Sequence, residues 1–200
     1  MAILPSLRLM PTLVLAEPTL VEDGHFLERV QAGDLEAIAE IYDRHHRALC
    51  TFASRLLGDD AAAEDLVHDV FVVLPKLVHK YSPDCSLRAF LLGIAANRAR
   101  HHVRAAARRR KLAERFSQEP PPALQTPEQH VQRRRLADRL ARALDRLSFE
   151  QRTAFVLCEI EGQSRREAAE ILSVPEATVR TRLFHARKKL QSFLGKERLP

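Results

Sequence analysis

The stretch Ser173–Leu190, SVPEATVRTRLFHARKKL, predicts how the C-terminal part of the chain folds. Apolar residues keep helical spacing on both sides of Pro175, although a proline inside a helix would break it. Proline is tolerated at the first helical position, because its missing N–H would have no partner there. We therefore expect a turn at Ser173 and Val174, followed by a helix that opens at Pro175 and runs to about Leu194.

Two further helix starts lie just upstream of this turn. Ser164-Arg165-Arg166-Glu167 has the form of a capping box and predicts a short helix that ends near Leu172. Ser148-Phe149-Glu150-Gln151 has the same form and predicts a helix over residues 149–161, with Gly162 just past its end. Two helices joined by a tight turn, the second of them basic, indicate a helix-turn-helix.

The outer face of the last helix carries the candidate DNA contacts. The N-terminal part of such a helix enters the major groove, where arginine can bond guanine bidentately and a threonine methyl can pack on thymine. Basic residues farther along suit phosphates. The candidates are Glu176, Thr178, Arg180, Thr181, Arg182, His185, Arg187, Lys188 and Lys189. The alternative from the pattern alone is an amphipathic helix hairpin with a solvated, charged face.

A proline-rich segment upstream divides the chain. Residues 117–127, SQEPPPALQTP, hold three consecutive prolines, which favour an extended spacer. Thr126-Pro127-Glu128 then has the cap, proline and acid of a helix start.

Before this spacer the chain predicts three longer helices. Asp34 can cap a helix that ends at Gly58, and Asp60 can cap the next one, which Pro75 should end or kink. Ser86 can cap a third, running from Leu87 to about Leu112, whose first half is apolar and whose second half is strongly basic. A basic extension of a half-buried helix is a good phosphate-binding element.

Length and composition suit an all-α protein of one large domain or two small ones, and the charge suggests that the two halves prefer different partners. The chain has 200 residues, only 6 glycines and no run of β-branched residues, which argues against a large sheet. Residues 1–97 hold 8 basic and 14 acidic side chains, whereas residues 98–200 hold 24 and 12. The basic half suits nucleic acid or an anionic surface, and the acidic half suits a basic protein.

The cysteines indicate no disulfide framework and no zinc ribbon, because the three are far apart and form no CxxC. His46 and Cys50 have the spacing of two ligands on a helix face, but no second pair accompanies them, so we expect a buried thiol beside a surface histidine, with no metal and no cofactor. The apolar N-terminal stretch is broken by prolines and is too short for a signal peptide or a membrane span. We expect a flexible extension over residues 1–24 and a cytoplasmic protein.

Three stretches together carry a resemblance to a known family. They are AEDLVHDVF (63–71), SLRAFLLGIAANRARHHVR (86–104) and LDRLSFEQRTAFVLCEIEGQSRREAAEILSVPEATVRTRLFHARKKL (144–190). In this order, around a variable linker, they resemble regions 2 and 4 of an extracytoplasmic-function (ECF) sigma factor of bacterial RNA polymerase. The resemblance implies region 2 over residues 25–112, a linker over 113–130 and region 4, with its helix-turn-helix, over 131–195.

The resemblance also implies roles for particular residues. The polar face of the AEDLV helix would dock on the polymerase large subunit, through Asp65, His68 and Asp69. Region 2 would bind the −10 element and a flipped base through Lys80, Tyr81, Arg88, Asn97, Arg98, His101 and Arg104, with the basic run 108–111 on phosphates. The last helix would read the −35 element. The chain departs from the family pattern at Pro75, Phe90 and His101, which bears on the identity of the −10 sequence.

Such a protein has no catalytic residues and directs core RNA polymerase to promoters, and the family implies an anti-sigma factor as a further partner. A second hypothesis is a helix-turn-helix regulator whose N-terminal helical domain senses a signal or dimerises; it would bind duplex DNA without polymerase. An enzyme has little support, because no GxxxxGK[ST], HExxH or Ser-His-Asp arrangement is visible.

Overall fold

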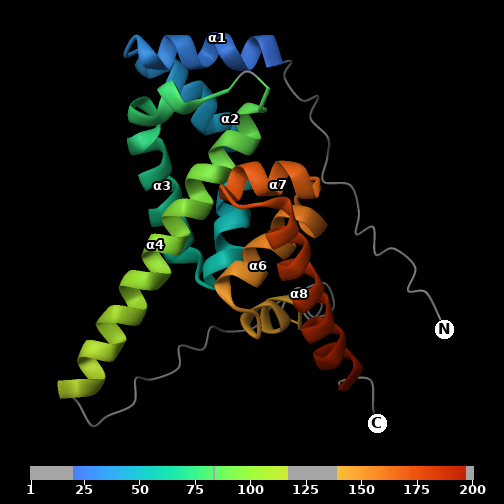
Figure 1. Ribbon diagram of the computed structural model, residues 1–200. Coiled ribbons are helices and arrows are strands. Elements are labelled where there is room, and N and C mark those ends of the chain that lie inside the picture. The colour runs from blue at the N-terminus through green and yellow to red at the C-terminus, as the bar shows by residue number, and fades with distance from the viewer. Residues whose placement is uncertain (1–19, 83, 117–138, 197–200) are drawn as a thin grey trace.

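The computed structural model describes residues 20–82, 84–116 and 139–196, and within those ranges the regular structure is entirely helical (Figure 1). The expected all-α fold is thus confirmed. The predicted spacer over residues 117–127 and the helix start at Thr126-Pro127-Glu128 lie outside the described residues, as do residues 1–19 of the predicted extension.

The N-terminal half is a bundle of helices around α2. It comprises α1 (Leu20–Gln31), α2 (Leu35–Leu57), α3 (Asp60–Leu77), a short 3₁₀ turn (Val78–Lys80) and α4 (Leu87–Phe116). The long helix α2 packs on α3 and α4, and α1 lies across one end of the bundle (Figure 1). Phe52 of α2, Val67 of α3 and Leu91 of α4 are fully buried. Each such side chain contributes about 1.5–3 kcal/mol to stability.

Local capping fixes most helix ends. The Asp34 carboxylate accepts from the backbone N–H of Glu36 and Ala37, and Gly58 closes α2 in the left-handed conformation at φ 73°. The Ser86 hydroxyl accepts from the N–H of Ala89, as expected of a cap. The expected cap of α3 was one residue off, because Asp59 is the residue whose side chain accepts, while Asp60 is already helical.

Of the two expected effects of Pro75, an end or a kink, the first is wrong, because Pro75 lies inside α3. The helix continues to Leu77, and the N–H of Val78 donates to the carbonyl of Leu74, one turn back. Leu74 and Val78 are both buried, so packing on either side of the proline holds the last turn in place.

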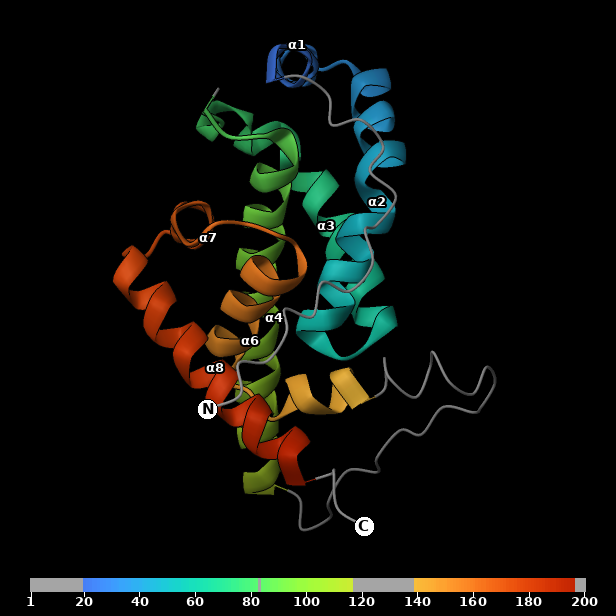
Figure 2. The ribbon, with the colours of Figure 1, turned by 90° about the vertical axis from the view of Figure 1, so that its right-hand side faces the viewer.

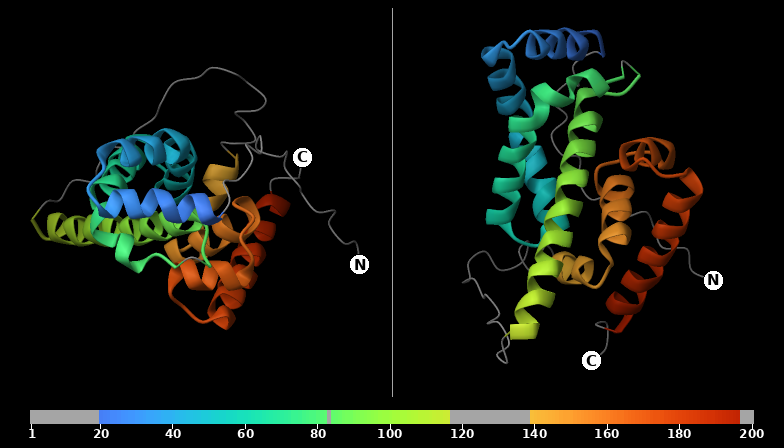
Figure 3. Two further views of the ribbon diagram at one scale, coloured as in Figure 1. Left: turned by 90° about the horizontal axis from the view of Figure 1, so that it is seen from above. Right: turned by 60° about the vertical axis from the view of Figure 1, so that its left-hand side comes forward.

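Helix α4 leaves the bundle and extends well beyond it (Figure 3). Its first half is buried, with Leu91, Leu92 and Ala95 in the core. It runs to Phe116, past the expected end near Leu112.

The C-terminal half contains a helical segment over residues 139–145, then α6 (Phe149–Phe155), a π-helical turn (Val156–Ile160), α7 (Arg165–Leu172) and α8 (Glu176–Lys196). Both predicted capping boxes are present, at Ser148 and at Ser164. Ser173 closes α7 with φ 52°, and α8 begins at Glu176. Pro175 stands just before that helix, and its carbonyl accepts from the N–H of Thr178.

The two halves pack against each other, α7 lying beside α4 and α6 lying beside α2 and α4 (Figures 2 and 3). Their buried side chains form one continuous hydrophobic cluster. Gly93 of α4 faces the backbone of Ile171 on α7: a methyl group at Gly93 would lie 3.6 Å from that carbonyl oxygen. None of the described helices is long and apolar enough to cross a membrane.

Candidate nucleic-acid and protein interfaces

Helix α8 presents one apolar and one basic face. Val179, Leu183 and Ala186 are buried against the preceding helices. The sequence-predicted contacts are exposed or, for Thr178 and Arg182, half-buried; the exposed ones are Glu176, Arg180, Thr181, His185, Arg187, Lys188 and Lys189. The structure thus brings this predicted set together on one helix.

Individual side chains on this face differ in what they already bind. The Thr181 hydroxyl donates to the carbonyl of Ala177, 2.9 Å away. Arg187 pairs with Glu159, and Glu176 lies 3.8 Å from Arg165. Thr178, Thr181, Arg182 and His185 line one shallow groove together with the start of α6.

The residues predicted to bind the −10 element do not form one cluster, because those on α4 lie at two places along the helix. Asn97, His101 and Arg104 are exposed, and their four- and three-residue spacing places them on one side of the helix. Arg98 is half-buried beside them. Arg88 lies nine residues before Asn97, which is about 14 Å along the axis.

Lys80 and Tyr81 precede the N-terminus of α4, whereas the basic part of this helix lies toward its C-terminus. Lys80 is exposed, whereas Tyr81 is half-buried and its ring meets Phe90 edge to face with centroids 5.5 Å apart. The side chains of residues 109–111 lie outside the described set, so the predicted basic run is described only at Arg108, which is exposed.

Arg88 points toward the C-terminal half rather than into solvent. Its Nη2 lies 2.6 Å from one carboxylate oxygen of Glu161, and Nη1 of Arg55 lies 2.9 Å from the other. The Glu161 side chain is only 6% exposed. The two cations neutralise this carboxylate, which a buried acid requires.

A second polar contact joins the halves at Arg152. Its guanidinium donates to the carbonyls of Leu144 and Leu56, at 3.0 and 2.9 Å, and pairs with Asp145 at 2.8 Å. Of these acceptors, Leu56 belongs to α2. Neither Arg152 nor Glu161 stood out in the sequence, because their partners in the N-terminal half are 73 to 106 residues away along the chain.

The exposed face of α3 is mainly acidic and also carries one large apolar side chain. Asp65, His68 and Asp69 are all exposed, at helical spacing. Val72, one turn farther on, is 57% exposed although it is a large apolar residue. Val72 was not among the predicted contacts; its position one turn after Asp69 is the signal that would have identified it.

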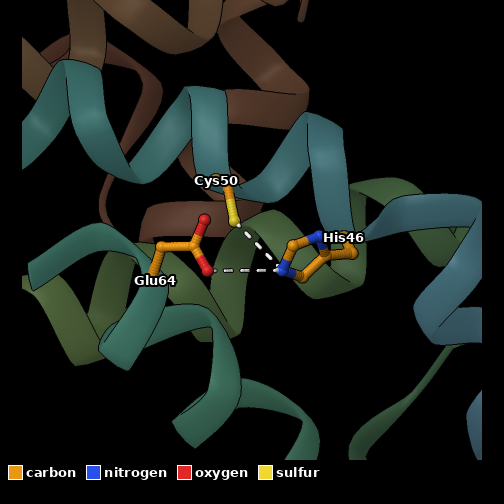
Figure 4. A group of neighbouring side chains, drawn as sticks. All are labelled: His46, Cys50 and Glu64. Atoms are coloured by element: carbon orange, nitrogen blue, oxygen red, sulfur yellow. Dashed lines mark hydrogen bonds and ion pairs between the residues drawn. The ribbon is translucent and has the colours of Figure 1, made fainter. Parts of the chain in front are cut away.

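A cluster of metal-ligating groups lies between α2 and α3 (Figure 4). Nε2 of His46 is 3.4 Å from Sγ of Cys50 and 4.0 Å from a carboxylate oxygen of Glu64. Burial, and then the charge of Glu64, raises the pKa of the Cys50 thiol. The i,i+4 spacing identified the first two residues, but only the packing of α3 on α2 brings Glu64 to them.

Two family models match the chain. The model described as sigma-70 region 2 matches residues 41–109, and the model described as sigma-70, region 4 matches residues 137–190.

Characterised relatives are similar over most of the chain. The RNA polymerase sigma factor CarQ of Myxococcus xanthus is 30% identical, across 84% of this chain and 95% of CarQ. The ECF RNA polymerase sigma factor SigE of Mycolicibacterium smegmatis is 35% identical, across 78% of this chain and 61% of SigE.

Two experimental structures have a similar fold. CnrH, in complex with the cytosolic domain of CnrY, is 26% identical with a TM-score of 0.63, covering 87% of this chain and 97% of CnrH. RpoE of Bartonella quintana, in complex with the anti-sigma factor NepR, is 26% identical with a TM-score of 0.64, covering 82% of this chain and 100% of RpoE.

Proposed function

The chain belongs to the ECF family of RNA polymerase sigma factors, non-catalytic initiation factors that direct core polymerase to promoters, and from this premise we propose how its surfaces divide that work. The observation that carries the proposal is the pairing, in one chain, of an exposed acidic face on α3 with an exposed basic face on α8. Region 2 occupies residues 25–112, the linker 113–130 and region 4 residues 131–195.

Helix α8 reads the −35 element. Arg180 and Arg182, with Thr178 and Thr181, lie in the first two turns, the part of a recognition helix that reaches base edges. Because the Thr181 hydroxyl is bonded to its own helix, its methyl group is the part available to a thymine. Glu176 and His185 flank this set, and the basic residues Arg187, Lys188 and Lys189 contact phosphates, which fix the helix in register.

Helix α4 and the loop before it bind the −10 element. Asn97, Arg98, His101 and Arg104 form a polar edge along which the opened strand can lie. Unstacking a base costs a few kcal/mol, so the separated strand has to be held by phosphate pairing and by stacking. Tyr81 supplies an aromatic surface, and Lys80 and Arg88 supply charge at the start of the helix.

The exposed face of α3 docks on core polymerase. Asp65, His68 and Asp69 provide a polar and mainly acidic surface in the half of the chain that is negatively charged. Val72 adds apolar area beside them, as the centre of a protein interface needs.

The packed arrangement of regions 2 and 4 is an inactive state. In it Arg88 is held by Glu161 and is withheld from DNA. Opening of the contacts around Glu161 and Arg152 lets α4 and α8 engage two separate promoter elements. Core polymerase provides the binding energy for this opening, since a partner that binds only the open form shifts the population toward it.

An anti-sigma factor is the second protein partner. CnrH and RpoE, which share this fold, were each determined with a bound partner. The chain acts in the cytoplasm, where the polymerase and the chromosome are.

Promoter binding measured with and without core polymerase tests the proposal. We expect weak binding of duplex promoter DNA by the purified chain alone and tight, sequence-specific binding after core is added. Equally tight and specific binding without core would contradict it and would favour a self-sufficient helix-turn-helix regulator.

A further inference from the structure

The side chains of His46, Cys50 and Glu64 offer an imidazole nitrogen, a sulfur and a carboxylate oxygen, one from each residue, all within 4.8 Å of one another. They are the only such group among the residues that the structure describes. Figure 4 shows the three side chains converging from two helices, with dashed lines from the imidazole Nε2 to both the sulfur and a carboxylate oxygen. These three donor types are the ones that zinc takes in proteins.

The geometry is close to that of a tetrahedral site. With Zn–N and Zn–S bonds of about 2.0 and 2.3 Å, two ligand atoms at a tetrahedral angle lie about 3.5 Å apart. The observed separation of Nε2 and Sγ is 3.4 Å. A nitrogen and an oxygen ligand would lie about 3.4 Å apart, whereas Nε2 and the Glu64 oxygen are 4.0 Å apart. Rotation of the Glu64 side chain, which is 67% exposed, can close that gap.

The environment orients the ligands and leaves an approach for an ion. The His46 ring stacks on Tyr42, with centroids 4.5 Å apart and planes 30° apart, which restricts the direction of Nε2. His46 and Cys50 are half-buried, whereas Glu64 is exposed. An ion can therefore enter from the Glu64 side and keep water as its fourth ligand, as zinc does in open sites.

We propose that His46, Cys50 and Glu64 form a binding site for a divalent transition-metal ion of the zinc class, which ties α2 to the start of α3. Its consequence rests on the proposed function: Glu64 directly precedes Asp65, so a bound ion would hold the first turns of the helix that docks on polymerase. Zinc binding and polymerase docking are measured separately, so failure of either leaves the other testable.

Zinc affinity of the full chain, measured by competition with a chromogenic chelator, is the first test. We expect one ion per chain, and at least about a tenfold weaker affinity in each of Cys50→Ser, His46→Asn and Glu64→Gln, because even outer groups of a zinc site contribute tenfold or more. Cys85→Ser and Cys158→Ser are the matched controls and should bind as the parent does. Equal affinity in all five variants would overturn the site.

Two measurements do not depend on how the variants fold. Cobalt added to the parent chain should give the near-ultraviolet band of a thiolate–cobalt bond, and zinc should protect Cys50 from alkylation but leave Cys158 unprotected, as read by mass spectrometry. A cobalt spectrum without the sulfur band, or equal alkylation of Cys50 with and without zinc, would contradict the metal site. The cluster would then be only a hydrogen-bonded cysteine and histidine beside a surface acid.

Discussion

At the scale of single residues, the basic side chains of α8 fall into two groups. Arg187 is paired with Glu159, so it must leave this carboxylate before it can bind a DNA phosphate. Arg180 is exposed near the start of the helix, and Arg182 is half-buried in the groove beside α6. Base reading is therefore expected to depend on the early arginines, and general affinity on the later basic residues.

Replacing both early arginines should abolish use of the −35 element. A good bidentate contact to a base contributes about 1–3 kcal/mol, so Arg180→Ala with Arg182→Ala should reduce transcription from a −35-dependent promoter to near background. Arg47→Ala, an exposed arginine of α2, is the charge-matched control. Runoff transcription with reconstituted holoenzyme measures the effect, and unchanged transcript levels in the double variant would refute the assignment.

Charge reversal on α3 should weaken polymerase binding. Asp65→Lys with Asp69→Lys should reduce affinity for core by at least about tenfold, or about 1.4 kcal/mol, because reversed charges would face like charges across the interface. Both positions are exposed, so the helical circular dichroism should not change. Asp43→Lys, on the exposed side of α2, is the control in a fluorescence-anisotropy titration. Parental affinity in the double variant would rule out this docking face.

His45 makes stability depend on pH. It is 8% exposed, and burial, with smaller contributions from Arg44 and Arg88, lowers its pKa from 6.5 to about 4. Below pH 6.5 His45 is protonated in the unfolded chain, whereas in the folded chain it stays neutral down to about pH 4. The free energy of unfolding therefore falls as the pH drops from 6.5 to about 4. Between pH 6.5 and 4.5 the loss is about 2–3 kcal/mol.

Urea denaturation at those two pH values measures this loss. His45→Leu should remove most of the difference, whereas His79→Leu, on an exposed histidine, should keep it. If His45→Leu retains the full difference, the pH dependence arises from other groups.

At the scale of elements, the π-helical turn Val156–Ile160 is followed directly by Glu161, the residue that joins the two halves. The N–H of Glu161 donates to the carbonyl of Val156, five residues back, and its carboxylate meets Arg55 and Arg88. Such turns widen a helix locally and are frequent at functional sites. The contact between regions 2 and 4 thus depends on a local irregularity in one helix.

Neutralising Glu161 should separate the two regions. Glu161→Gln removes the charge that balances two arginines, so the open form should gain population and binding of promoter DNA without core should rise. Glu159→Gln is the matched control for separation of the regions, because its partner Arg187 belongs to region 4 and the pair does not join the two regions. Energy transfer between dyes on α3 and α8 should fall in Glu161→Gln only; equal transfer in both variants would show that Glu161 does not hold the closed state.

Sequence predicted the elements whose ends are set locally. The capping boxes at Ser148 and Ser164 and the left-handed Gly58 are determined by residues within one turn, and they are where the sequence placed them. Pro75 does not end α3 as it could have, because the buried residues Leu74 and Val78 on either side of it outweigh one missing hydrogen bond. Three features could not be predicted, because they depend on tertiary packing and not on the spacing of residues along the chain. They are the π-helical turn, the partners of Glu161 and the position of Glu64 beside His46.

At the scale of the whole molecule, charge separates the two tasks. Residues 1–97 carry a net charge of −6 and residues 98–200 carry +12. We expect the positive half to supply DNA affinity that falls with salt as counterions are released. The negative half suits a protein partner over most of its surface, while the proposed −10 residues Lys80, Arg88 and Asn97 lie at its C-terminal end. This asymmetry fits a protein that reaches promoters in the company of polymerase.

Transcription by core polymerase reconstituted with the purified chain tests the central claim most directly. Start sites mapped across a genomic template should appear only when the chain is present and should share one −10 and one −35 sequence at a fixed spacing. Both elements should be needed, and Arg180→Ala with Arg182→Ala should remove the −35 requirement together with most of the transcript. Absence of any transcript that depends on the chain, with core of demonstrated activity, would contradict the account.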